Sequence, residues 1–215
     1  CDEELRLNRR WAPQLYLDVV PIVRVGHGVK VGGEGEPIEY AVRMRQFDQA
    51  MRLDHLVDRE RLTANDVVAV AEEIAQRHCM ARRVSPGTHL LATTERLIWD
   101  NFRELRDEVP DALLRKLEAW MERALSRYES LISERIDNGW IRECHGDLHL
   151  ANIVKLPDGI RAFDCIEFSR ELREIDVVAD YAFLTMDFIA RGAVGYAYVF
   201  VNRYLEKTGD YDGAR

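Results

Sequence analysis

The stretch HGDLHLAN, residues 145–152, constrains this chain more than any other part of it. It places two imidazoles, a carboxylate and a carboxamide within eight residues, and short apolar runs flank it on both sides. The segment FDCIEF, residues 163–168, adds two more carboxylates shortly afterwards. Burying so many polar groups without partners is unfavourable, so these residues are expected to have binding partners or to face solvent. It indicates a metal site, a phosphoryl-transfer loop or a polar turn without chemistry.

Phosphoryl transfer accounts for the order of these polar residues. The reaction needs a carboxylate that orients the attacking hydroxyl and accepts its proton, and Asp147 directly follows Gly146 on a predicted loop. Asn152 and Asp164 offer the oxygen ligands that Mg²⁺ prefers. The order Asp, Asn, hairpin, Asp is that of a kinase catalytic loop followed by its metal-binding aspartate.

The rest of the chain predicts an α+β fold. The first part is expected to hold one helix and two strands, and from about residue 47 the apolar spacing becomes helical. The helices are expected over residues 2–10, 94–105, 111–138, 176–190 and 194–207, with a further helix behind a capping box at Thr63 and Asp66 and a break at residues 85–87. The strands are expected over residues 15–25 and 38–45, joined by a Gly-rich connection, and in a hairpin over residues 153–163.

Composition excludes several classes of partner. A net charge of -8 and a pI near 5.3 argue against a general nucleic-acid or anionic-membrane binder. No apolar run approaches the ~20 residues that a membrane span needs. The four cysteines, Cys1, Cys79, Cys144 and Cys165, lack any CxxC pairing, which predicts a reduced, cytoplasmic chain without structural zinc.

Two motifs resemble a known family. HGDLHLAN is similar to the HGDxHxxN catalytic loop of the aminoglycoside phosphotransferase and choline kinase branch of the protein-kinase-like fold. FDCIEF is similar to the metal-binding segment of the same branch, in which Asp-x-x-Glu replaces Asp-Phe-Gly. Together with ELRLNRR, YLDVVPI and YAVRMR, these motifs resemble a bacterial subfamily whose members often join such a half to a P-loop ATP-binding half.

The resemblance implies a function and a division of the chain. The function is ATP- and Mg²⁺-dependent transfer of the γ-phosphate to a hydroxyl of a small molecule. The division is a partial small β lobe over residues 1–47 and a helical lobe over residues 48–215. The partner implied, besides the small-molecule acceptor, is a fused or separate P-loop ATP-binding domain. The identity of the acceptor stays open, because fold-level analogy carries no substrate information.

The resemblance also implies roles for residues of the central loop. Asp147 is implied as the catalytic base, with Asn152 and Asp164 as Mg²⁺ ligands. Asp180, in DYAFL, is implied as the aspartate that supports the backbone of the catalytic loop.

Further roles are implied around the nucleotide. Glu4 matches the helix glutamate that pairs with an ATP-anchoring lysine, while Met44 and Arg45 belong to the hinge segment beside adenine. Supporting roles are implied for three residues that match the motifs, His145, His149 and Glu167.

The chain departs from the family pattern at its start. A complete small lobe begins with a strand, a phosphate-covering loop and a strand bearing the lysine, and none of these precedes Cys1. A truncated chain with weak ATP binding is therefore expected. Residues 26–35 and Arg43 could in principle replace the glycine loop and the lysine, but Val31 stands where the third glycine belongs, and a hairpin tip is the better prediction.

Two alternatives to a phosphotransferase stay open. His145, Asp147 and His149 alternate, so in a strand they would face one way and could ligate the metal of a hydrolase. A pseudokinase-like or truncated binding module is the second alternative. His78 is predicted to be an ordinary residue of an amphipathic helix face, and the charged run 52–61 a solvated face. The four tryptophans, Trp11, Trp99, Trp120 and Trp140, are predicted to lie in the core.

Overall fold

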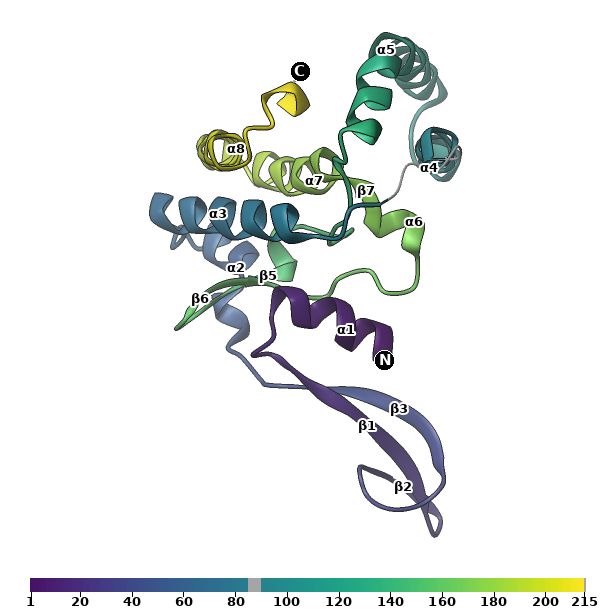
Figure 1. Cartoon of the computed structure of the whole chain (residues 1–215), viewed down its shortest axis with the longest axis vertical. Helices are drawn as coiled ribbons and strands as arrows, with labels where there is room; N and C mark the ends of the chain where they lie inside the picture. The colour runs from purple at the N-terminus through teal and green to yellow at the C-terminus, as the bar shows by residue number, and fades with distance from the viewer. Residues whose placement is uncertain (85–89, 215) are drawn as a thin grey trace.

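The computed structural model describes residues 1–84 and 90–214 and has an α+β architecture. A three-stranded antiparallel sheet projects from a larger helical body, and α1 lies where the two meet (Figure 1). The α-helices are α1 (Asp2–Trp11), α2 (Leu53–Asp58), α3 (Ala64–Met80), α4 (Leu90–Glu104), α5 (Asp111–Asp137), α6 (Arg170–Arg173), α7 (Val177–Ala190) and α8 (Val194–Thr208). Short 3-10 helices are η1 (Gln49–Met51), η2 (Leu105–Asp107), η3 (Leu150–Asn152) and η4 (Tyr211–Ala214). The predicted break at residues 85–87 lies outside the described residues.

The projecting sheet has the order β2-β1-β3 and consists of β1 (Tyr16–Val25), β2 (Gly28–Val31) and β3 (Pro37–Met44). The two long strands confirm the strands predicted over residues 15–25 and 38–45. The short strand β2 was not predicted, because all four of its residues are exposed and its GVKV sequence offers no burial pattern. Residues 26–27 and 32–35 thus form the turns on either side of β2, at the tip of the sheet. Arg43 pairs with Asp18 across β1 and β3 at 2.5 Å.

The main core of the body is formed by helices that are far apart in the chain. Leu7 and Trp11 of α1 are buried together with apolar residues of α3, α7 and α8, such as Ile74 and Phe200. The capping box predicted for α3 is confirmed, since the Thr63 and Asp66 side chains bind each other's backbone N–H groups. α1 is therefore held to the body by its buried face while its other face reaches the sheet.

Two pairs of short strands connect the polar motifs to this core. β4 (Ile141–Glu143) pairs with β7 (Glu174–Asp176), and β5 (Ile153–Leu156) pairs with β6 (Gly159–Ala162). The β5–β6 hairpin is the one predicted between HGDLHLAN and FDCIEF. The stretch HGDLHLAN runs from the end of β4 to the start of β5.

Two predictions about burial are corrected. Trp120 is 57 % exposed, because α5 extends away from the core and, along its full described length, buries only Leu114 and Arg135. Trp11, in contrast, is buried as predicted. The run 52–61 is not a uniformly solvated face, because Asp54 is buried and forms an ion pair with Arg52 at 2.6 Å. Across the described ranges, no helix is both long and apolar enough to pass through a membrane.

Candidate active site

Asp180 of α7 holds the backbone of the central loop. The residue is 2 % exposed, and its carboxylate accepts hydrogen bonds from the backbone N–H groups of His145 and Gly146, both at 2.9 Å. A third bond comes from Nε2 of His78 at 3.0 Å. Burial opposes ionisation of Asp180, but these hydrogen bonds outweigh it and keep the pKa of the carboxyl below its ordinary value. The loop therefore has a charged anchor in the core.

The His145 imidazole bridges the loop to the segment before Asp164. Its Nε2 donates to the carbonyl oxygen of Phe163 at 2.9 Å, which places the ring proton on Nε2. The other nitrogen, Nδ1, accepts from the backbone N–H of Asp147 at 3.4 Å. The ring is fully buried, and burial lowers its pKa, so it is neutral and both of its nitrogens are engaged. A metal-binding role for His145 would require breaking at least one of these two bonds.

Gly146 allows the chain to turn sharply between its two neighbours. Its φ is +87°, and a Cβ atom at this position would lie 2.8 Å from the carbonyl oxygen of Leu172. Only glycine satisfies both conditions without movement of the backbone. The turn leaves the adjacent Asp147 carboxylate accessible, with 39 % of its side chain exposed.

Asp147 and Asn152 are held together by hydrogen bonds. The amide nitrogen of Asn152 donates to the Asp147 carboxylate and to the Asp147 carbonyl oxygen, each at 3.1 Å. None of the hydrogen bonds between described residues uses the amide oxygen of Asn152, which is the atom that a metal ion would need. His149 lies close to the same carboxylate, with its Nε2 3.4 Å from Oδ2 of Asp147 and its ring edge-on to Phe183.

Asp164 follows the β5–β6 hairpin in a left-handed backbone conformation. Its φ is +66°, a conformation that is uncommon for a residue other than glycine and often marks a functional position. The backbone N–H of Asp164 donates to the Tyr16 hydroxyl at 3.0 Å, and that of Cys165 donates to Oδ1 of Asn8 at 2.9 Å. Side chains from β1 and α1 thus fix this segment, while Asp164 itself is exposed.

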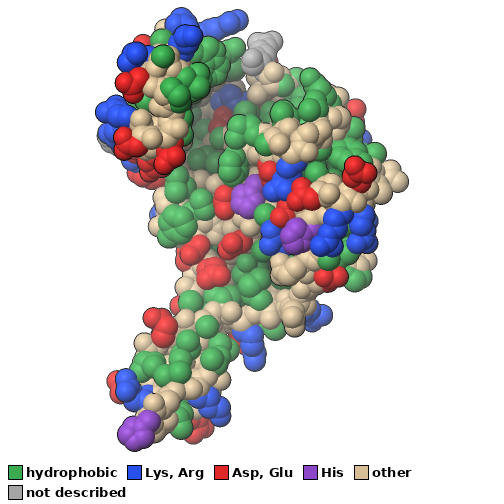
Figure 2. Space-filling model, turned by 180° about the vertical axis from the view of Figure 1, so that it is seen from behind, with side chains coloured by type: hydrophobic (Ala, Val, Ile, Leu, Met, Phe, Trp, Pro, Cys, Tyr) green, Lys and Arg blue, Asp and Glu red, His purple; other side chains and the backbone are tan. Residues whose placement is uncertain are grey.

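Glu4, Asp164 and Glu167 form an acidic group beside the loop. Burial, followed by the negative charges of Glu167 and Asp164, raises the pKa of Glu4 above its ordinary value. Among the described residues, no lysine or arginine forms an ion pair with any of these three carboxylates. Figure 2 shows acidic side chains gathered where the projecting sheet meets the helical body. An oxygen-rich group of this kind, together with Asn152, fits a hard cation such as Mg²⁺.

The predicted hinge residues lie between the sheet and the body. Arg45 lines a cavity of about 740 Å³ with residues that include Phe47, Met51 and Leu156. Its backbone N–H donates to the Leu15 carbonyl oxygen at 2.8 Å. Met44 pairs with Tyr16 in the sheet and does not line this cavity. The adenine contact implied for the two residues stays a prediction.

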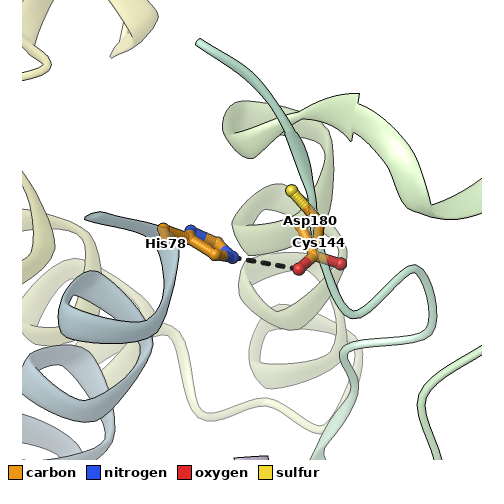
Figure 3. Close-up of side chains that lie close together, drawn as sticks. All are labelled: His78, Cys144 and Asp180. Carbon is orange, nitrogen blue, oxygen red and sulfur yellow. Dashed lines mark hydrogen bonds and ion pairs between the residues drawn. The ribbon is translucent and has the colours of Figure 1, made fainter. Parts of the chain in front are cut away.

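His78, Cys144 and Asp180 lie close together in the core behind the loop (Figure 3). Their potential ligand atoms are within 4.8 Å of one another, as in a metal site. However, burial raises the pKa of the Cys144 thiol well above its ordinary value, and the thiol donates to the Ile175 carbonyl oxygen at 3.5 Å. Since both oxygens of Asp180 already accept hydrogen bonds, the cluster fits a hydrogen-bonded support better than a metal site.

His78 is the residue of this site whose role the sequence did not reveal. It was predicted to be an ordinary face residue, yet it is 1 % exposed and joins Asp180 to the Tyr204 hydroxyl, which lies 2.8 Å from its Nδ1. The signal was its place on the apolar stripe of α3, one turn after Ile74. A histidine on a core-facing stripe needs polar partners, and these partners come from helices that follow much later in the chain.

Comparison with known proteins yields relatives without an assigned activity. No family model matches the chain. The chain is 32% identical over 219 residues to an uncharacterized protein of Mycobacterium bovis and to an uncharacterized protein of Mycobacterium tuberculosis. Each match covers 98% of this chain and 42% of the relative. The chain thus spans less than half the length of the curated relatives that it matches.

Proposed function

We propose that this chain carries the catalytic loop of an ATP- and Mg²⁺-dependent phosphotransferase with a protein-kinase-like fold. The phosphoryl acceptor is a hydroxyl of a small molecule, as in the aminoglycoside phosphotransferases that the motifs resemble. The observation that carries the proposal is the bridge made by His145. One imidazole binds the backbone N–H of Asp147 and the carbonyl oxygen before Asp164, so the two loops are held side by side.

Asp147 has the position and the accessibility of a general base. Its carboxylate is fixed on one side by the Asn152 amide and remains accessible to solvent. In the proposed reaction, this carboxylate orients the acceptor hydroxyl and takes its proton as the hydroxyl oxygen attacks the γ-phosphorus. Because Asp180 holds the loop backbone from behind, Asp147 does not have to be ordered when the substrate arrives.

Asn152 and Asp164 are the residues that would hold Mg²⁺. The amide nitrogen of Asn152 is bound to Asp147, which leaves the amide oxygen for the ion, and Asp164 is exposed. A bound Mg²⁺ would neutralise charge on the phosphates of ATP. The acidic group of Glu4, Asp164 and Glu167 supports a cation here, supplied by the metal or by the lysine that the family resemblance pairs with Glu4.

The two alternative functions have less support. The hydrolase needs His145 as a ligand, whereas both nitrogens of this ring are bound to backbone atoms in the core. A binding module without catalysis does not require the Asp147, Asn152 and Asp164 arrangement. A P-loop ATP-binding domain as a fused or separate partner remains a prediction of the resemblance.

The proposal is tested by replacing Asp147 with asparagine in the full-length protein. We expect Asp147→Asn to lower ATP turnover, measured as release or transfer of labelled γ-phosphate with a panel of small hydroxyl compounds, by about 10²- to 10⁴-fold, the usual contribution of a general base. The matched control is Asp107→Asn, which removes an exposed carboxylate between α4 and α5 and should leave turnover unchanged.

Two outcomes would contradict this assignment. Undiminished turnover by Asp147→Asn would exclude Asp147 as the base. Stoichiometric zinc in the purified protein, detected by elemental analysis, would favour the hydrolase, because Zn²⁺ prefers nitrogen and sulfur ligands over the oxygen set proposed here. In the phosphotransferase, Asp164→Asn should additionally weaken Mg²⁺-dependent ATP binding, while Asp147→Asn should not.

A further inference from the structure

A cavity of about 490 Å³ lies between α1 and the C-terminal part of α3, and it is not used by the proposed reaction. Its walls also include residues that follow α3 and one residue of β4. The lining contains five arginines, Arg6, Arg9, Arg10, Arg77 and Arg82, and a single carboxylate, Glu143. We call this space the arginine cavity. Such a lining is unexpected in a chain whose net charge is -8.

The single carboxylate of the arginine cavity is shared by several guanidinium groups. Glu143 is buried and lies 2.8 Å from both Arg6 and Arg10, with Arg82 and Arg173 each at 3.6 Å. Burial opposes its ionisation, but Arg6, Arg10 and Arg82 outweigh burial and lower the pKa of Glu143 to about 2. One permanent negative charge therefore serves to orient several arginines without neutralising them all.

Carboxylates outside the cavity do not remove the excess of positive charge. Glu3, Glu73 and Glu174 pair with Arg6, Arg77 and Arg82 from the outside. With these and Arg173 included, six guanidinium groups face four carboxylates. Arg9 is bonded to the carbonyl oxygens of Tyr16 and Leu17, so no carboxylate balances it in this network.

Helix dipoles explain only part of this cluster. The C-terminal ends of α1 and α3 favour nearby cations, which accounts for arginines in their last turns, such as Arg10 and Arg77. The dipole effect fades beyond the last turn, so it does not account for Arg6 in the middle of α1 or for Arg82 beyond the end of α3. The convergence of these side chains on one cavity needs a further reason.

We propose that the arginine cavity binds a small molecule that carries two or more linked phosphate groups. Guanidinium groups match phosphate oxygens with paired, charge-assisted hydrogen bonds, and several of them in one cavity favour a multiply charged anion over a single one. The side chains of Arg6 and Arg82 are about half exposed, so their remaining donors reach solvent and a ligand. This site is separate from Asp147 and Asp164, and its existence does not depend on the proposed reaction.

The arginine cavity is connected to the candidate active site through shared elements. α1 carries three of the arginines and also Glu4, and Glu143 precedes His145 by two residues. A bound polyphosphate would draw α1 and the C-terminal end of α3 together, since each of these supplies arginines to the cavity. We therefore expect the bound ligand to reduce local unfolding of α1.

The test is titration of the protein with inorganic tripolyphosphate by calorimetry, in EDTA so that no Mg²⁺ is present. We expect saturable binding that weakens by at least about tenfold in the double variant Arg9→Gln/Arg82→Gln, since the two substitutions remove charge-assisted hydrogen bonds to the phosphates. The matched control, Arg59→Gln/Arg61→Gln, removes the same charge from exposed positions after α2 and should bind like the wild type. Asp164→Asn should also bind like the wild type.

Several results would overturn the proposal. These are the absence of saturable binding, equal weakening in the control variant, or binding that requires Mg²⁺ and is lost in Asp164→Asn. Tighter binding of a phosphorylated peptide than of tripolyphosphate and ADP would exclude a small molecule as the ligand. A measurement without variants guards against unfolding of the double variant: tripolyphosphate should slow hydrogen exchange in α1, and unchanged exchange there would contradict the site.

Discussion

Gly146 shows how strongly a single residue limits the candidate catalytic loop. Its N–H binds Asp180, its φ is positive, and the carbonyl oxygen of Leu172 lies against it. These three features come from three different parts of the chain. The backbone of the loop is therefore determined by contacts around Gly146 as much as by the loop itself.

Replacing Gly146 with alanine should destabilise the protein by more than the penalty for placing alanine in a left-handed backbone conformation. Gly192, between α7 and α8, has a similar φ of +75°, but a Cβ atom added there would have nothing within 4 Å. We expect Gly192→Ala to lower the free energy of unfolding by roughly 1–2 kcal/mol, the penalty for a left-handed alanine. Gly146→Ala should lower the free energy of unfolding further, because its Cβ would lie 2.8 Å from the carbonyl oxygen of Leu172. Urea denaturation of both variants measures the difference, and equal losses would contradict the close contact.

Glu143 should make the stability depend on pH in the acidic range. Arginine neighbours lower its pKa from 4.5 to about 2, so its stabilisation is complete above pH 4.5 and is lost as the pH falls towards 2. The shift corresponds to about 3 kcal/mol. We expect Glu143→Gln to flatten the decline in unfolding free energy over this range, measured by urea denaturation at successive pH values.

The matched control for Glu143 is Glu104→Gln, which removes an exposed carboxylate at the end of α4. Its curve should run parallel to that of the wild type. An unchanged slope in Glu143→Gln would mean that the arginines do not hold this carboxylate in its charged form. The separate loss of stability from buried, neutral His145 begins at higher pH, as the pH falls below 6.5, and should persist in both variants.

At the scale of elements, three helices meet through one chain of hydrogen bonds. Tyr204 of α8 binds His78 of α3, which binds Asp180 of α7, which binds the loop backbone. Trp11 of α1 packs edge-on against both His78 and His145. The loop is thus coupled to the packing of the helices behind it.

Substitutions at different positions in this series of hydrogen bonds should lower the free energy of unfolding by different amounts. Tyr204→Phe removes one hydroxyl and should lower the unfolding free energy by roughly 1 kcal/mol. His78→Ala removes the donor to a buried carboxylate and should cost about 3 kcal/mol or more, with a loss of the proposed phosphoryl transfer. Thermal or urea denaturation and the turnover assay check both. Unchanged stability and turnover in His78→Ala would show that Asp180 does not depend on this partner.

At the scale of the whole molecule, the sheet and the helical body differ in burial. All of β2 and most of β3 are exposed, and large apolar side chains of the sheet, among them Val31 and Tyr40, face solvent. In contrast, α3 and α8 each bury one face in the main core. Figure 1 shows the sheet extending from the body, with α1 at the junction.

The sheet should open more readily than the body. Few buried contacts and exposed backbone hydrogen bonds lower the free energy of local opening, so amides of β2 and β3 should exchange with solvent faster than those of α3 and α8. Hydrogen exchange followed by mass spectrometry measures this difference on the native protein. Equal protection of β3 and α3 would contradict it and would indicate that the sheet is covered in solution.

Much of this architecture could be predicted where local rules decide it. The strands at either side of residues 26–37, the capping box at Thr63 and the hairpin after Asn152 follow from spacing and turn chemistry. The order of Asp147, Asn152 and Asp164 is likewise readable, because all three lie within one short stretch of chain. The wrong prediction that Trp120 is buried shows the limit of such rules. A periodic apolar face predicts a helix but does not predict whether another element covers that face.

Local sequence by itself determined which residues carry the candidate chemistry and in what order they follow one another. Only the tertiary structure decided what holds them. His78 and Asp180 meet across 102 positions of the chain, Tyr16 reaches Asp164 across 148, and Arg6 reaches Glu143 across 137. Such partners leave no periodic signal, because they depend on how distant helices and strands pack. The polar stretch from His145 to Asn152 is visible in the sequence, whereas its rigidity comes from the fold.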